Sequence, residues 1–195
     1  MIRPLAVGIA CLVLGGSAGA TPLSRVIEPK TGNSACFVRD YDAAHLRRHP
    51  QQAIQSIMVS MKFDASESSP VTRIMLRQRG RAEPLHIVGS CNFEVRANRD
   101  TQGNRLIRSF QRESAHDCLA ITAPSSAEEG GYFLIDLAAD GRTLTLYLED
   151  QVRAWRGAQA GDAQPQRFGR EDRIFRLNRT AASACTSLER GFEGP

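Results

Sequence analysis

Lysine is almost absent from this chain of 195 residues, and the chain has little excess of positive charge. Lys30 and Lys62 are the only lysines, although lysine and arginine together number 25. The formal net charge is only +4, and acidic residues are scattered among the arginines, which argues against a nucleic-acid-binding protein. Two explanations of the arginine bias stay open: the codon usage of a GC-rich genome, and an arginine-rich surface for anionic partners.

The motifs that identify common enzyme classes are also missing. The sequence has no G-x-S-x-G, no phosphate-binding G-x-x-x-x-G-K-[ST] and no G-x-G-x-x-G. Its cysteines lack the C-x-x-C spacing that is typical of structural zinc sites. These absences favour a protein without enzymatic activity and without a cofactor, but they do not exclude an enzyme.

An apolar run at the amino terminus indicates export. Leu5 to Leu14 is too short to span a bilayer, which needs about 20 residues. Arg3 precedes this run and the small residues Ala18-Gly19-Ala20 follow it, as in a secretory signal with its cleavage site. We expect residues 1–20 to be a signal peptide and the mature chain to be periplasmic or secreted, without an integral membrane segment.

Four cysteines remain after the signal is removed. An even number in an oxidising compartment predicts two disulfides, and four cysteines allow three pairings. We favour Cys36 with Cys185, which would join the ends of the ordered region, and Cys91 with Cys118, which would bridge two strands. The other pairings stay open at this point.

The mature chain is long enough for one domain with its own core. Residues 21–35 lack apolar periodicity and are expected to form an extended lead-in to a single disulfide-braced β domain, residues 36–190. A short helix over Tyr41–Arg48 would begin at Asp40 or Asp42, because an aspartate can cap its free N–H groups.

Most of the domain reads as short strands. Ile57, Val59, Met61 and Phe63 alternate with more polar residues, which predicts a strand with one buried face. Leu106–Phe110 is expected to form another strand. Tyr132–Leu137 and Thr143–Leu148 flank Asp140-Gly141, which favours a hairpin with positive φ at both turn residues. The pattern predicts a mainly β fold: one antiparallel β-sandwich or small barrel of about eight strands, with one short N-terminal helix.

Two polar groups are candidate functional residues. His45 and His49 lie four residues apart on the predicted helix, so both rings could project from one face and bind a metal with a third ligand. A structural role for both histidines is the alternative. Arg170, Asp172 and Arg173 precede the last strand and form either a surface salt-bridge cluster or a rigid polar contact patch.

The stretch from Cys36 to Gln52 follows the pattern C-x-x-x-x-Y-x-x-x-H-L-x-x-H-P-x-Q, and Gly130-Gly131 and Asp172–Leu177 provide later landmarks. The chain thereby resembles an uncharacterised family of small secreted alphaproteobacterial proteins. The resemblance implies an exported, disulfide-bonded, β-rich domain and transfers no catalytic residues. Leu119–Glu129 departs from that family's pattern.

These observations favour an exported, non-enzymatic binding or inhibitor-like envelope protein. Its partner would be a periplasmic protein or an anionic envelope polymer, and not a nucleic acid. The alternative is a metal-dependent hydrolase or a metal-binding protein that uses His45 and His49.

Overall fold

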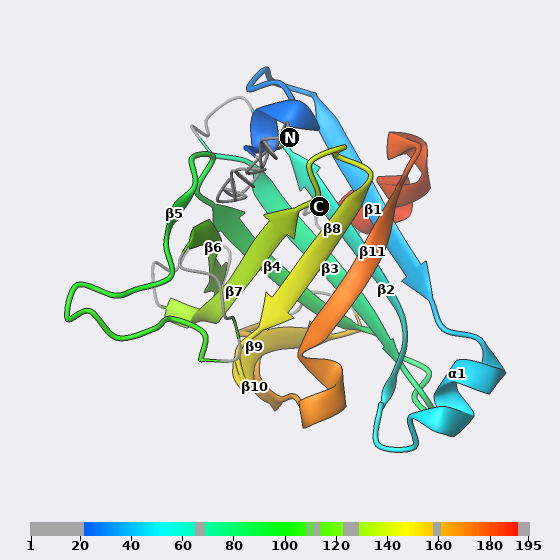
Figure 1. Cartoon of the computed structure of the whole chain (residues 1–195). Helices are drawn as coiled ribbons and strands as arrows, with labels where there is room; N and C mark the ends of the chain where they lie inside the picture. Colours follow the sequence, from blue (N-terminus) through cyan, green and yellow to red (C-terminus); the bar gives the residue numbers. More distant parts are fainter. Residues whose placement is uncertain are drawn as a thin grey trace, which may run out of the picture.

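A closed, eight-stranded antiparallel barrel forms the body of the protein (Figure 1). This computed structural model describes residues 22–64, 69–108, 110, 114–122, 129–157 and 161–190, so the predicted signal peptide lies outside it. The barrel strands are β1 (Ser34–Asp40), β2 (Ile54–Lys62), β3 (Val71–Gln78), β4 (Leu85–Cys91), β6 (Ser114–Ile121), β7 (Glu129–Leu137), β8 (Thr143–Leu148) and β11 (Ile174–Thr180).

The barrel strands follow one another around the wall in chain order. β4 pairs with β6 past the intervening segment, and β11 pairs back onto β1, so that Cys36 lies opposite Thr180. Closure of the sheet on itself removes the unpaired strand edges that an open sheet exposes. The mainly β fold was predicted correctly, and of the two architectures that the sequence allowed, the chain forms the barrel and not the sandwich.

Apolar side chains fill the barrel interior. Ile57, Val59 and Met61 point inward from β2 and are buried, as their alternation predicts. Leu144, Leu146 and Leu148 of β8 do the same. Removing one side chain of this size from water contributes roughly 2 kcal/mol, so the inner face of each strand fixes its register.

Both ends of the barrel are closed by other parts of the chain. At one end, the 3-10 helix η1 (Leu23–Arg25) and the residues after it bury Leu23, Val26 and Ile27 in the core. The lead-in is therefore not simply extended, because these apolar residues recur at helical spacing and cover the barrel opening. At the other end, the hairpin of β9 (Gln151–Arg156) and β10 (Gln164–Arg167) crosses the opening (Figure 1).

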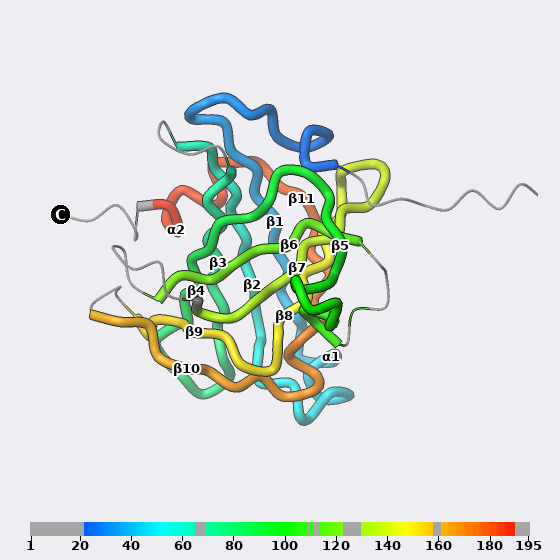
Figure 2. Tube along the Cα trace, turned by 90° about the vertical axis from the view of Figure 1, so that its left-hand side faces the viewer, coloured from blue at the N-terminus to red at the C-terminus, as the bar shows by residue number. Residues whose placement is uncertain are grey.

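The segment between β4 and β6 covers part of the outer wall (Figure 2). It contains the short strand β5 (Arg96–Ala97), and its Ile107 and Phe110 pack against Leu134 and Tyr147. The prediction of a strand over Leu106–Phe110 was wrong, since its described residues form turns and coil. The buried Asn98 side chain bonds to the main chain of Ile107 and Phe110, in place of a neighbouring strand.

The predicted helix is α1 (Ala43–Arg48), and Asp42 caps it by accepting a hydrogen bond of 2.7 Å from the His45 N–H. The expectation of a single helix was wrong. A second helix, α2 (Thr186–Arg190), follows the 3-10 helix η3 (Ala182–Cys185). Buried Cys185 and Leu188 hold this carboxy-terminal segment against the barrel, which stabilises helices too short to form alone.

The β7–β8 hairpin is present, but its turn differs from the expected one. The connection runs from residue 138 to 142, and only Gly141 has positive φ, at 65°. The Gly141 N–H donates to the Ala138 carbonyl at 2.9 Å, and Asp140 accepts from the Arg142 N–H. The longer loop lets Asp140 keep an ordinary φ and leaves the left-handed conformation to glycine.

Two disulfides join the pairs favoured from the sequence, Cys36 with Cys185 and Cys91 with Cys118. The second pair lies directly opposite across β4 and β6, where the register contains only three residue pairs. No helix in the described part of the chain is long and apolar enough to cross a membrane. The two disulfides are consistent with an extracellular or periplasmic protein.

The two disulfides should differ in their contribution to stability. The bonds close loops with sequence separations of 149 and 27 residues. On the chain-entropy model, losing the longer loop costs about 5 kcal/mol and losing the shorter about 3.5 kcal/mol. We therefore expect the Cys36→Ala, Cys185→Ala double variant to lose more free energy of unfolding in urea than Cys91→Ala, Cys118→Ala. The reverse order would show that the β4–β6 seam depends on its disulfide more than loop entropy predicts.

Candidate functional site

The two polar groups predicted from the sequence meet at one end of the barrel. α1 lies beside the 3-10 helix η2 (Arg170–Asp172), and His49 Nδ1 is 3.8 Å from Glu171 Oε1. The chain therefore brings together residues that are more than a hundred positions apart.

Tyr41, His45 and His49 form a column of rings, named here the histidine stack. The ring centroids of Tyr41 and His45 are 4.6 Å apart, and those of His45 and His49 are 4.3 Å apart. His45 Nε2 also lies 3.0 Å from the Gln52 side-chain oxygen. Burial raises the pKa of Tyr41, against the opposing effect of nearby Arg39. The spacing of four residues therefore stacks the two imidazoles against each other.

Asp172 has a structural role. Its side chain is buried, and its carboxylate accepts hydrogen bonds from the Ala53 N–H at 2.9 Å and the Ile54 N–H at 3.0 Å. Two bonds to a charged acceptor fix η2 against the start of β2. Arg170 is exposed on η2, and Arg173 is the residue that follows η2. The hydrogen bonds of Asp172 therefore also position Arg173.

The histidines do not form a metal site with the described residues. Within the ranges that the structure describes, no group of three or more His, Cys, Asp or Glu side chains could hold a metal ion. His45 and His49 instead contact each other, Gln52 and Glu171. The stack is better explained as the packing that holds α1 against the barrel end.

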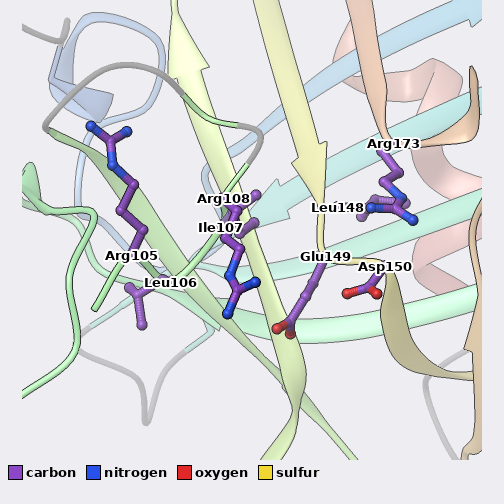
Figure 3. Close-up of a pocket in the computed structure, with 8 residues that line it drawn as sticks. All are labelled: Arg105, Leu106, Ile107, Arg108, Leu148, Glu149, Asp150 and Arg173. Atoms are coloured by element: carbon purple, nitrogen blue, oxygen red, sulfur yellow. The ribbon is translucent and has the colours of Figure 1, made fainter. Parts of the chain in front are cut away.

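A groove of about 550 Å³ opens beside η2 (Figure 3). We call it the Glu149 groove. Hollows of about 590 Å³ and 330 Å³ adjoin it and are lined by Glu149 as well. The lining of the groove includes Arg105, Leu106, Arg108, Glu149, Asp150 and Arg173.

Three distant segments line this groove. Arg105 and Arg108 come from the segment that covers the outer wall, Glu149 and Asp150 from the β8–β9 turn, and Arg173 from the residue before β11. Figure 3 shows Glu149 and Asp150 between Arg108 and Arg173. Among the described residues, no salt bridge joins these arginines to these carboxylates. The groove thus presents charges of both signs that do not neutralise one another by direct contact.

A main-chain hydrogen bond from β7 holds the Glu149 side chain in place. One of its carboxylate oxygens accepts the Tyr132 N–H at 3.2 Å. Partial burial raises the pKa of Glu149, and the neighbouring charge of Asp150 raises it further, against the effect of the Tyr132 bond. An ionised Glu149 is therefore a poorly solvated charge.

The pair Gly130-Gly131 makes this arrangement possible. Gly131 has a φ of 97°, and a Cβ on it would lie 2.8 Å from the Gln151 carbonyl oxygen and 3.5 Å from Glu149 Oε2. A Cβ on Gly130 would lie 2.7 Å from the Ala120 carbonyl oxygen. Only glycine allows β7 to approach its neighbours so closely here.

Sequence reasoning found Arg173 but missed Glu149, Asp150 and Arg108. The available signal was two adjacent acidic residues between two strand-like alternations, with a diglycine upstream. That signal is weak, because acidic residues are common in exposed turns.

The pKa of Glu149 predicts an effect of pH on stability. Because the pKa is raised in the folded state, that state binds the proton more tightly than the unfolded chain, and stability falls as pH rises from about 4.3 through the raised pKa. Glu149→Gln removes this loss. We expect Glu149→Gln to have a larger free energy of unfolding in urea than the wild type at about pH 7. The difference between the two proteins should be smaller at about pH 3. Glu28→Gln, an exposed control, should show no such pH dependence. A Glu149→Gln protein that gains nothing between the two pH values would contradict this account.

No family model, curated protein or solved structure matches the chain. The resemblance to small secreted alphaproteobacterial proteins is therefore a proposal, and the role of the groove rests on its geometry and charge.

Proposed function

We propose that this protein is an exported, non-enzymatic binding domain of the bacterial envelope, inhibitor-like in that it acts by docking to a partner in the Glu149 groove. The observation that carries the proposal is a concave surface with charges of both signs, between which the described residues form no salt bridge. The filled barrel supports it, since a core packed with side chains and covered at both ends directs ligand contact to the outer surface.

The charges of the groove favour a protein as the partner. Arg108 and Arg173 suit carboxylates, and an anionic envelope polymer would satisfy them equally well. Such a polymer would also bring negative charge towards Glu149 and Asp150, which costs binding energy. A polypeptide can present both signs at matched positions. Of the two partner classes expected from the sequence, we therefore propose a periplasmic protein.

The lining of the groove supports binding without catalysis. The described residues that line it include no Ser, Thr, Cys or His that could act as a nucleophile or as an imidazole base. Residues 1–20, with their features of a secretory signal, and the two disulfides support a place outside the cytosol. We propose the periplasm as that place.

A capture experiment with matched charge reversals tests this function. The disulfide-intact mature protein, Arg108→Glu and Arg142→Glu serve as baits in a periplasmic extract. Arg108 and Arg142 are both exposed, but Arg142 lies in the β7–β8 loop at the other end of the barrel. We expect the wild type and Arg142→Glu to enrich the same protein. Arg108→Glu should retain at most about one tenth of it, because replacing an attraction by a repulsion at a close interfacial charge pair costs roughly 1.5 kcal/mol or more.

Two outcomes of the capture experiment would contradict the proposal. One is that the wild-type bait enriches no protein. The other is that Arg108→Glu and Arg142→Glu capture the same protein equally well, which would place the interface outside the groove. Thermal unfolding of each bait verifies that all three are folded.

A further inference from the structure

Glu149 forms no salt bridge with any described residue, although arginines line the same groove. Glu149 is half-buried and accepts one hydrogen bond, from a main-chain N–H. Asp150 follows it in the same turn and adds a second carboxylate. Asp150 is exposed, but a half-buried carboxylate such as that of Glu149 is normally paired, because removing its charge from water is costly unless an opposite charge replaces the solvent.

Three arginines around the groove donate hydrogen bonds to main-chain carbonyls. Arg105 donates to the Phe110 carbonyl at 2.6 Å, and Arg173 donates through Nε to the Phe168 carbonyl at 3.0 Å. Arg153, which lines an adjoining hollow together with Glu149, donates to the Ala163 carbonyl at 3.1 Å. Among the described residues, none of these arginines forms a salt bridge with Glu149 or Asp150. A basic group on a bound partner could therefore pair with these carboxylates.

The positions of the arginines limit which cation can enter. In Figure 3, Arg108 lies on one side of Glu149, and Arg173 lies on the other side, above Asp150, so a cation at these carboxylates would be close to positive charges as well. An isolated basic side chain would be repelled by both arginines. A basic side chain with an acidic neighbour would not, because the acidic group can pair with an arginine while the basic group reaches the carboxylates.

We infer that the Glu149 groove recognises a polypeptide segment in which a lysine or arginine side chain, bound between Glu149 and Asp150, is next to an acidic side chain that pairs with Arg173. This inference rests on the proposed function and specifies the chemistry of its partner. The groove volume of about 550 Å³ lies within the usual range for ligand sites, roughly 300–1,000 Å³. The alternating charges make the site selective, since neither a polycation nor a polyanion satisfies both signs.

Blocked peptides with single changes test the inference. The probe is an N-acetylated, C-amidated peptide with the core Gly-Glu-Lys-Gly, titrated into the ¹⁵N-labelled mature protein and followed by amide chemical shifts. We expect saturable shifts at the amides of residues 149, 150 and 173. Replacing the lysine of the probe by norleucine, or its glutamate by glutamine, should weaken binding at least fivefold.

Matched variants locate the contacts. Glu149→Gln should weaken binding of the lysine probe at least fivefold and leave the already weak binding of the norleucine probe unchanged. Arg173→Gln should weaken binding of the probe that contains glutamate and leave binding of the probe that contains glutamine unchanged. Glu28→Gln, exposed and outside the groove, should bind like the wild type. The resting amide spectrum of each variant shows whether it is folded.

The outcomes distinguish this inference from the proposed function. If Arg108→Glu loses the captured partner but the norleucine and lysine probes bind equally, the groove is an interface and the inferred chemistry is wrong. Equal binding of the lysine probe to the wild type and to Glu149→Gln would also overturn the inference. If the bait captures no partner and the peptide probes cause no amide chemical-shift changes, both the proposed function and the inference are wrong.

Discussion

Closure of the sheet is the constraint on which the rest of this structure depends. β11 pairs with β1 over a few residues, and β4 pairs with β6 over three residue pairs next to the Cys91–Cys118 disulfide. Once the β11–β1 and β4–β6 pairings have formed, the inward side chains of the eight strands share one core. Among the described residues, each strand of the barrel wall pairs with a neighbour on both sides, so the wall offers no free strand edge for another chain to extend.

The carboxylate of Asp172 connects the core to those loops. By accepting two main-chain hydrogen bonds at the start of β2, it ties the chain before β11 to a segment 118 positions earlier. The histidine stack packs at the same end of the barrel, where His49 lies close to Glu171. Residues that suggested metal chemistry in the sequence thus hold together the end of the barrel at which Arg173 faces the groove.

The groove illustrates how structural bonds can leave functional charge unsatisfied. Guanidinium groups that could have neutralised Glu149 are used to fix turns, through carbonyls of Phe110, Phe168 and Ala163. Gly131 lets the main chain of β7 approach so closely that the Tyr132 N–H donates a hydrogen bond to the Glu149 carboxylate. A poorly solvated charge on a rigid scaffold costs some stability, and in the proposed function it supplies a preorganised contact for a partner.

Local chemistry determined the elements: alternation set the buried face of β2, the Asp42 cap began α1, and Leu137 and Leu144 bracketed the β7–β8 hairpin. Tertiary structure alone decided between sandwich and barrel, because both bury the same alternating residues. It also decided that Asn98 would replace a strand partner near Ile107. The groove could not be read from the sequence, since its lining comes from three segments that only the closed barrel brings together.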